Sequence, residues 1–508
     1  MKSVAKSSLI IAFFFGINKI LSFVRQLFVA REFELSYELD VFNAANNIPD
    51  LMSALISGGA LAVAIIPVLT EFLEKENRKK TWRLFSNILN LAFLATTALA
   101  AALFIFAPVF IRNIIVPGFP AEQQLLAIEL MRLDLVAIII FSISGLFMAG
   151  LQANRHFLFP AIAPGMYNIG QIFGVAILAP STGYTIFGIT LPALGLGIHG
   201  LVYGVIIGAA LHLLIQVPGL ITHGFYWEPR LRIQSKGVLQ VLYLLGPRVI
   251  TMFFIQMFFI IRDNLASGMG EGAVTALNLG WFIMQVPQSL IGTALGIAIL
   301  PTISAAISQG KEREFIRGAN AAIRALIALT LPITVFLTIG LYRLTEFAFG
   351  YTPEDTQRVV LASQIYLAGM LGHVLLEIAS RAFYAKQKPK VPLIAAALNA
   401  GGYFILSLLL SNYLGFAGIA WANSIIFTTQ AILLLVILNR QHPGIFSLQG
   451  LLLRICVVSF ILGLGFFVYL NHLPVSTPFI RSITGMGLGL VLTVAIMRKE
   501  IQPIFQVK

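Results

Sequence analysis

The sequence consists mostly of apolar runs of about 20 residues, joined by short polar connections. A run of that length is what an α-helix needs to cross a bilayer. The 508 residues are 58% hydrophobic and 11% charged, whereas a soluble domain carries about 25% charged residues. We therefore predict an all-α polytopic membrane protein with about fourteen transmembrane helices. The predicted spans are residues 7–30, 41–71, 84–111, 126–152, 159–179, 194–221, 239–266, 273–307, 319–343, 359–384, 391–411, 416–438, 450–470 and 480–497.

Basic residues gather in alternate connections between these spans. Such loops face the cytoplasm, beside the anionic leaflet. Both termini are therefore expected in the cytoplasm, and the same loops explain the net charge of +13 without a nucleic-acid partner. The N-terminal apolar run lacks a small-residue cleavage site, so we expect it to remain as the first helix. The main basic connections contain Lys75, Arg78, Lys79, Lys80, Arg83, Arg155, Arg230, Arg232, Lys236, Lys311, Arg313, Arg317, Lys386, Lys388, Lys390 and Arg440.

Two distant segments resemble each other. They are "FVRQLFVAREFELSYELDVFNAANNIPDLMSALISGGALAVAIIP" and "IIRDNLASGMGEGAVTALNLGWFIMQVPQSLIGTALGIAILP". The copies start six spans apart, so they share one orientation and predict two parallel six-helix lobes facing a central site, as in transporters. The predicted lobes are residues 1–222 and 223–440, and residues 441–508 add two helices and a cytoplasmic tail. The matching positions are Arg25, Pro49 and Pro67 in the first copy, and Arg262, Pro287 and Pro301 in the second.

The first span carries three cations at intervals of six residues: Lys19, Arg25 and Arg31. Six residues rotate a helix face by about 240°, so the three cannot all point into one site. Arg25 lies deepest, and a charge at that depth usually faces a cavity or a partner. Arg31 and Lys19 could instead extend toward an interface. Asp40 could be the counter-ion of Arg25 or could cap the second helix.

Further charged groups lie inside later spans. Arg262 and Asp263 are adjacent near the end of the seventh span. Arg262 is a candidate contact of an anionic head group, and Asp263 is a candidate charge-pairing residue. Adjacent side chains diverge on a helix, so they are not automatically an ion pair. His373 and Glu377 share a helix face and are a candidate proton or ion relay, with structural hydrogen bonding as the alternative. Asp134 in the fourth span is one more candidate.

The chain lacks the sequence signatures of the common catalytic classes. It has no Walker motif, no HExxH and a single cysteine, Cys456, so we expect no direct use of ATP, no metal site and no cofactor. The outward connections are too short to house a transferase site. The chain is therefore not expected to be an enzyme, and membrane potential or an ion gradient is the expected source of energy.

An arginine in a low-dielectric cavity pairs best with phosphate or carboxylate. A drug-cation exporter would need acidic groups there instead. The expected cargo is thus anionic, and a lipid that carries phosphate suits a cavity within the membrane.

Several segments resemble the MurJ/MviN lipid II flippase family of the MOP exporter superfamily. They are "NKILSFVRQLFVAREF", "ELDVFNAANNIPDLMSALISGGALAVAIIPVLTEF", "LQANRHFLFPAIAPGMYNIGQI", "EGAVTALNLGWFIMQVPQSLIGTALGIAILPTIS" and "RAFYAKQKPKVPL". The resemblance implies alternating access between two lobes, and a groove from the last two helices for the lipid tail. It implies that lipid II, a polyprenyl-diphosphate-linked peptidoglycan precursor, moves from the inner to the outer leaflet of a bacterial plasma membrane. In the resemblance, Arg25 matches the family's arginine in the first span, Asp40 matches its aspartate at the start of the second, and Lys19 takes the place of an arginine. Together with the charges placed in the spans above, the candidate diphosphate contacts are Arg25, Lys19, Arg31 and Arg262, and the candidate gating or charge-pairing residues are Asp40 and Asp263.

The sequence departs from that family at several positions. Lys19 stands where an arginine is usual, and Gln26 replaces a common aspartate. Ser53 and Phe282 occupy positions where cavity arginines are typical, and Gln285 replaces a usual acidic residue.

These departures leave alternative functions open. The same scaffold could export another polyprenyl-linked glycan or anionic lipid, or the chain could be a non-transporting scaffold for envelope synthesis. A multidrug cation antiporter is disfavoured by the cationic cavity. Expected partners are lipid II or a related lipid, membrane lipids, and cell-wall synthesis proteins.

Overall fold

The computed structural model describes residues 2–56, 60–186, 188–386, 388, 390–448, 450–472, 478–500 and 502. Packing divides the chain into two compact units, Met1–Gly272 and Ala273–Lys508. The first unit contains α1 (Lys2–Phe33), α2 (Tyr37–Ala45), α3 (Asn47–Ile56), α4 (Ala60–Lys75), α5 (Arg78–Phe110), the π-helix η1 (Ile111–Ile115), α6 (Ala121–Ala153), α7 (Leu158–Phe173), the π-helix η2 (Gly174–Leu178), the hairpin β1 (Thr185–Ile186) and β2 (Ile189–Thr190), α8 (Ile198–Leu214), α9 (Val217–Thr222) and α10 (Lys236–Ala266). The second unit contains α11 (Ala273–Gln288), the π-helix η3 (Ser289–Thr293), α12 (Ala294–Ser308), α13 (Glu312–Phe349), α14 (Pro353–Ala385), α15 (Lys390–Leu414), α16 (Phe416–Gln441), α17 (Leu451–His472) and α18 (Pro478–Ile496).

The all-α membrane architecture is confirmed. Among the described residues, eleven helical segments are long and apolar enough to cross a membrane. The three other predicted spans coincide with interrupted helices or with a helix that is described only in part. These are α2 to α4 for residues 41–71, α10 for 239–266, and α11 to α12 for 273–307.

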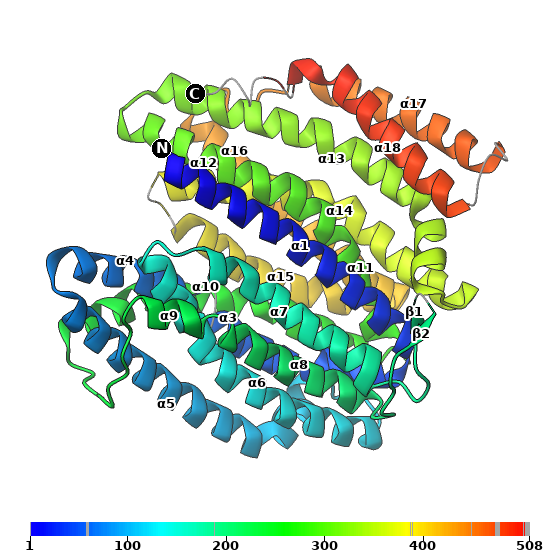
Figure 1. Cartoon of the computed structure of the whole chain (residues 1–508). Coiled ribbons are helices and arrows are strands. Elements are labelled where there is room, and N and C mark those ends of the chain that lie inside the picture. Colours follow the sequence, from blue (N-terminus) through cyan, green and yellow to red (C-terminus); the bar gives the residue numbers. More distant parts are fainter. Residues whose placement is uncertain are drawn as a thin grey trace. The chain divides into compact units, whose positions relative to one another are not determined.

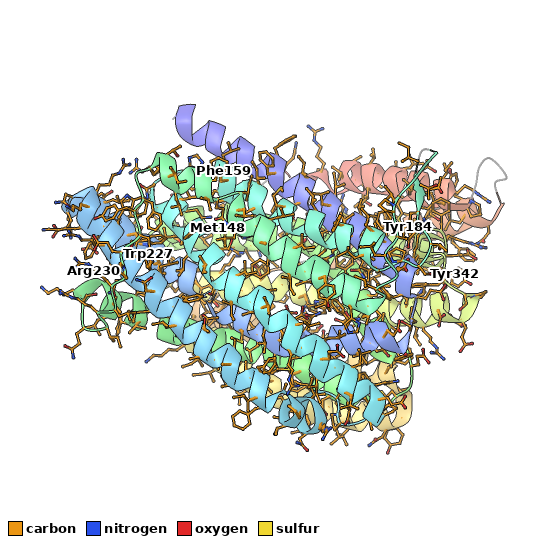
Figure 2. All side chains as sticks on the ribbon, turned by 60° about the horizontal axis from the view of Figure 1, so that its bottom comes forward. Met148, Phe159, Tyr184, Trp227, Arg230 and Tyr342 are labelled. Atoms are coloured by element: carbon orange, nitrogen blue, oxygen red, sulfur yellow. The ribbon has the colours of Figure 1, made fainter. Side chains whose placement is uncertain are left out.

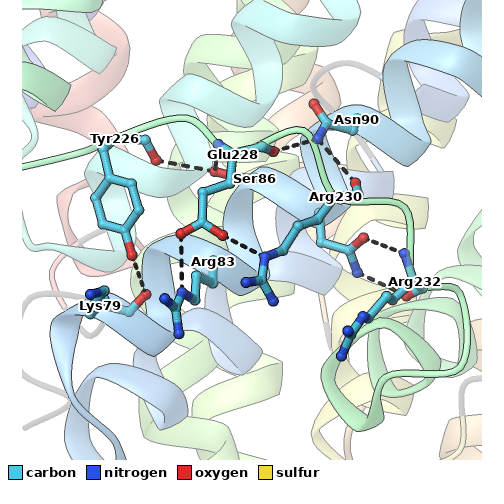
Figure 3. Close-up of polar contacts among 9 residues, drawn as sticks. Lys79, Arg83, Ser86, Asn90, Tyr226, Glu228, Arg230 and Arg232 are labelled. Carbon is cyan, nitrogen blue, oxygen red and sulfur yellow. Dashed lines mark hydrogen bonds and ion pairs between the residues drawn. The ribbon is translucent and has the colours of Figure 1, made fainter.

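The first unit extends one helix beyond the predicted lobe boundary at residue 222. Residues between α9 and α10 lie along the start of α5, where Ser86 Oγ donates to Tyr226 O at 3.2 Å (Figure 3). The amide nitrogen of Asn90 donates to Glu228 O at 2.8 Å and to Arg230 O at 3.0 Å. This chain path leads into α10, which packs against α3 and α4. Compact packing therefore ends at Gly272, while the lobe division inferred from the repeat stays a prediction.

Two glycine contacts bring α7 and the following η2 close to α8. A Cβ added to Gly170 would lie 2.3 Å from Gly208 Cα, and one added to Gly174 would lie 2.5 Å from Gly204 Cα. Small residues at a membrane helix interface allow this close backbone approach. The contact fixes the position of α7, which carries polar side chains of the site described below.

The second unit is built around α14, which packs against α11, α13 and α16. In Figure 1, α17 and α18 run beside α13, and helix contacts confirm that all three pack together. Phe336 of α13 is 1% exposed and meets the ring of Phe466 of α17 edge-on, with centroids 5.9 Å apart. The two additional C-terminal helices are thus held on the second unit by apolar packing.

Candidate functional site

Arg25 lies on α1 where this helix packs against α7. Its Nη1 donates to Oε1 of Gln171 at 3.0 Å. Tyr167, one helical turn before Gln171, and Asp50 of α3 both interact electrostatically with the guanidinium. A guanidinium has five N–H donors, so the bond to Gln171 leaves donors for an anionic group.

A second charged group lies at the end of α10. Nε of Arg262 donates to Oδ1 of Asp263 at 2.7 Å, and Nη2 of Arg262 donates to Oδ2 at 3.2 Å. Oδ2 of Asp263 also accepts from the amide of Asn47 at 2.7 Å. Both charged side chains are buried, with Arg262 4% and Asp263 0% exposed. The divergence expected of adjacent helix residues is overcome, because the long arginine side chain reaches back to its neighbour.

Asp50 connects these two groups electrostatically. Its carboxylate interacts with Arg25, with Arg262 and with Asp263. Opposite charges within a helix bundle stabilise one another far more than they would in water. The arrangement therefore presents two arginines and two acidic side chains inside one unit, with Arg25 the less buried of the two cations.

A cavity of about 270 Å³ adjoins these groups. Figure 2 labels Met148 of α6, one of its apolar lining residues. Asp50 and Asp134 line it. Tyr167 and His212 complete the titratable part of the lining. Titratable groups from four helices of the first unit thus line one cavity.

The other predicted cations of α1 lie apart from this group. Lys19 lies over the ring of Phe15 on its own helix, with Nζ 5.6 Å from the centroid. Arg31 is exposed at the end of α1 and acts electrostatically on Tyr184. The pKa of Tyr184 is raised by burial and by its hydrogen bond to Glu32. This separation agrees with the rotation expected from the six-residue spacing.

Asp40 does not cap the second helix, so that alternative was wrong. The N-cap of α2 is Ser36, whose hydroxyl accepts from the backbone N–H of Leu39 at 3.3 Å. Asp40 lies in the first turn, is 1% exposed, and accepts from the backbone N–H of Gly272 at 2.7 Å. Its carboxylate thus ties α2 to the segment that follows α10.

The two candidate relay residues lie in the second unit, and each has its own partner. Nε2 of His373 is 3.1 Å from Oδ1 of Asn423. Glu377 accepts from Nε of Arg381 at 3.1 Å. Among the described residues, no hydrogen bond joins His373 to Glu377, and the geometry matches the structural alternative.

Three polar residues of this group were not singled out by the sequence: Asp50, Tyr167 and Gln171. The last two are four residues apart in the otherwise apolar "PGMYNIGQI", a spacing that places them on one helix face. Of the departures from the family, Phe282 is half-buried on α11, and the side chain of Ser53 lies outside the described residues.

The sequence is similar to a known protein family and to several of its members. The family described as "Lipid II flippase MurJ" matches residues 29–483. A relative of that name from Burkholderia cenocepacia is 28% identical over 444 residues, covering 84% of this chain and 82% of the relative. A "Probable lipid II flippase MurJ" from Bdellovibrio bacteriovorus is 25% identical over 512 residues, covering 96% and 91%.

Solved structures share the fold. The structure titled "Lipid II flippase MurJ, inward closed conformation" has a TM-score of 0.80 at 22% identity, over 97% of this chain and 100% of that one. An inward-facing multidrug resistance MATE transporter of the MOP superfamily has a TM-score of 0.69 at 14% identity, over 84% and 95%. Since the family match extends over most of the sequence, this chain belongs to the lipid II flippase MurJ family.

Proposed function

We propose that this chain is a flippase that moves lipid II from the inner to the outer leaflet of a bacterial plasma membrane, for cell-wall synthesis. The observation that carries the proposal is the family match over residues 29–483. The position of Arg25 supports it, because a half-buried guanidinium with donors to spare suits a diphosphate.

The lipid tail needs a separate apolar path. The second unit has an apolar cavity of about 390 Å³ lined by residues of α13 and α17. Val335 and Phe467 are among these residues, and Cys456 and Gly463 face the same space. A long hydrocarbon chain gains roughly 0.8 kcal/mol for each CH₂ group that it buries. This cavity supports the proposal that the tail lies beside α17, one of the two additional C-terminal helices.

The test is replacement of the flippase in living cells. The full chain is expressed in bacteria depleted of their own lipid II flippase, and lipid II exposed on the outer leaflet is measured. Exposure should return above that of an empty-vector control. Absence of exposure from a protein whose membrane level equals that of the depleted flippase would contradict the proposal.

A second cargo is favoured by one observation. Phe282 and Ser53 stand where the family usually has cavity arginines, which removes two cations. Another polyprenyl-linked glycan or anionic lipid is therefore the alternative cargo. The same depletion assay separates the two, because export of a different lipid would leave outer-leaflet lipid II at the control level.

Topology and energy source belong to the same proposal. The basic alternate loops support cytoplasmic termini, which a reporter fused to either end would test. The sequence has no Walker motif for binding ATP, which supports an ion gradient or the membrane potential as the driving force. Cell-wall synthesis proteins are proposed partners.

A further inference from the structure

Asp134 is a buried acidic residue of the first unit. It lies in the middle of α6 and is 1% exposed. Within the described part of the chain, neither carboxylate oxygen has a hydrogen-bond partner. The side chain nevertheless lines the cavity of about 270 Å³ described above. A buried carboxyl group without donors is rare, because burial removes water without replacing it.

The groups that face this cavity offer Asp134 no compensation. Asp50 of α3 is a second carboxyl, and it acts electrostatically on Asp134 as a like charge. Tyr167 of α7 lines the cavity, and its side chain forms a hydrogen bond with that of Gln171 on the same helix. His212 of α8 has Nδ1 only 2.6 Å from Oγ of Ser144, so this ring nitrogen is already occupied.

The remaining helices that pack on α6 add no cation to the lining. The end of α2 contributes the neutral Asn46, and no titratable residue of α4, α5, α9 or η1 is among the lining residues that the structure describes. Arg25 of α1 acts on Asp50 and Tyr167, which leaves Asp134 without an opposite charge. Most other lining side chains are apolar, including Ile138 and Phe141.

A carboxyl group in such a place can be neutralised in two ways, by a metal cation or by a proton. Within the described residues, no group of three or more His, Cys, Asp or Glu side chains could hold a metal ion. A proton needs no ligand set, because one O–H bond forms on a carboxyl oxygen and the charge disappears. We propose that Asp134 is a proton-binding site, occupied in the packing described here and able to exchange its proton through the cavity.

Asp50 takes the complementary state. Arg25 and Arg262 act on its carboxylate as opposite charges, which Asp134 lacks, so the proposal assigns the ionised state to Asp50 and the neutral state to Asp134. Two carboxyl groups whose surroundings differ in this way hold different protonation states at one pH. In the exchange step, the O–H bond of Asp134 breaks, its electron pair stays on the carboxylate, and water in the cavity accepts the proton. A proton bound at Asp134 is distinct from the lipid that the chain is proposed to move.

The test is infrared spectroscopy of the purified full chain in lipid nanodiscs, with no cargo added, so it is independent of the proposed function. At neutral pH the wild type should show the C=O band of a protonated carboxylic acid. Asp134→Asn should lose that band, and Asp50→Asn, as the matched control, should keep it. The inference is overturned if Asp134→Asn keeps the band, or if replacing choline by sodium at constant pH abolishes it, because the site would then bind a cation.

A second measurement covers the case in which a variant folds poorly. Asparagine has the shape of the neutral acid, so Asp134→Asn should fold if the proposal is correct. Between about pH 5 and about pH 9 the thermal midpoint of the wild type should fall relative to that of the variant, because rising pH removes the proton. Parallel profiles would overturn the proposal.

Discussion

The two units of the molecule differ in how many Asp, Glu, Lys and Arg side chains they bury. The first unit buries Asp40, Asp134, Arg262 and Asp263, all at 4% exposure or less. In the second unit, Glu500 is the one buried Asp, Glu, Lys or Arg among the described residues, at 6%. In the interior of the second unit, the imidazole of His373 bonds to the uncharged amide of Asn423, so this contact is not an ion pair. Charge in a membrane interior is costly, so ionisable groups kept there usually mark functional sites, and we propose that head-group and ion chemistry belong to the first unit.

The largest expected effect is on the buried ion pair of the first unit. Asp263→Ala removes the carboxylate that forms an ion pair with the buried Arg262, and breaking a buried ion pair typically costs about 3–5 kcal/mol in the free energy of unfolding. The matched control is Glu354→Ala, which removes an exposed ion pair with Arg358 and should cost about 0–1 kcal/mol. Denaturant unfolding of the purified variants measures both. An equal loss in the two variants would remove the distinction between the units.

A smaller effect is expected for the neutral contact of the second unit. Asn423→Leu removes the amide oxygen that accepts from Nε2 of His373, and an unsatisfied buried group costs about 1–3 kcal/mol. Asn113→Ala, whose amide bonds Val109 O at an exposed position, should change the unfolding free energy by less than about 0.5 kcal/mol. A loss of unfolding free energy for Asn423→Leu as large as that for Asp263→Ala would contradict the expected difference between the two units.

Transport should be nearly insensitive to the candidate relay. Glu377 is paired with Arg381 and has no hydrogen bond to His373 among those given for the described residues. We therefore expect Glu377→Gln to keep outer-leaflet lipid II exposure within about twofold of the wild type, a change of less than about 0.5 kcal/mol in the barrier. A tenfold loss with normal membrane insertion would place ion chemistry in the second unit as well.

The smallest effect is expected at the surface network of Figure 3. Burial acts to raise the pKa of Glu228, but hydrogen bonds from Arg83 and Arg230 outweigh it and lower this pKa. The stabilising contribution is therefore present above the ordinary glutamate value of about 4.3 and is lost as pH falls through the lowered value. Between about pH 6 and about pH 3 the thermal midpoint of the wild type should fall slightly more than that of Glu228→Gln. A steeper fall for the variant would contradict the assigned pKa shift.

The fold was predictable because hydropathy acts locally along the chain. Each apolar run of sufficient length must become a helix in a bilayer, whatever its neighbours are. The interruption between α2 and α3 was harder to predict, because the run from 41 to 71 is mostly apolar and long enough to be predicted as one span. Asn46 and Asn47 mark the interruption, and Asn46 is the C-cap of α2.

The site was predictable only in part, because its contacts join distant positions. The depth of Arg25 in its span indicated a partner, but Gln171 lies 146 residues away and no local pattern connects the two. For Arg262 and Asp263, helix geometry alone predicted divergence, and the rotamer of the arginine decided the contact. Asp134 was visible as a charge in an apolar span, whereas its lack of partners is a property of the packing around it.

The most direct test of the central claim is the affinity of the purified chain for lipid II in nanodiscs. Arg25→Ala removes a charge-assisted contact worth roughly 1.5–3 kcal/mol, so Kd should rise by about ten- to a hundredfold. Arg381→Ala, the matched arginine of the second unit, should change Kd by less than about twofold. Equal losses in both variants, or an unchanged Kd for Arg25→Ala, would contradict the assignment of head-group binding to the first unit.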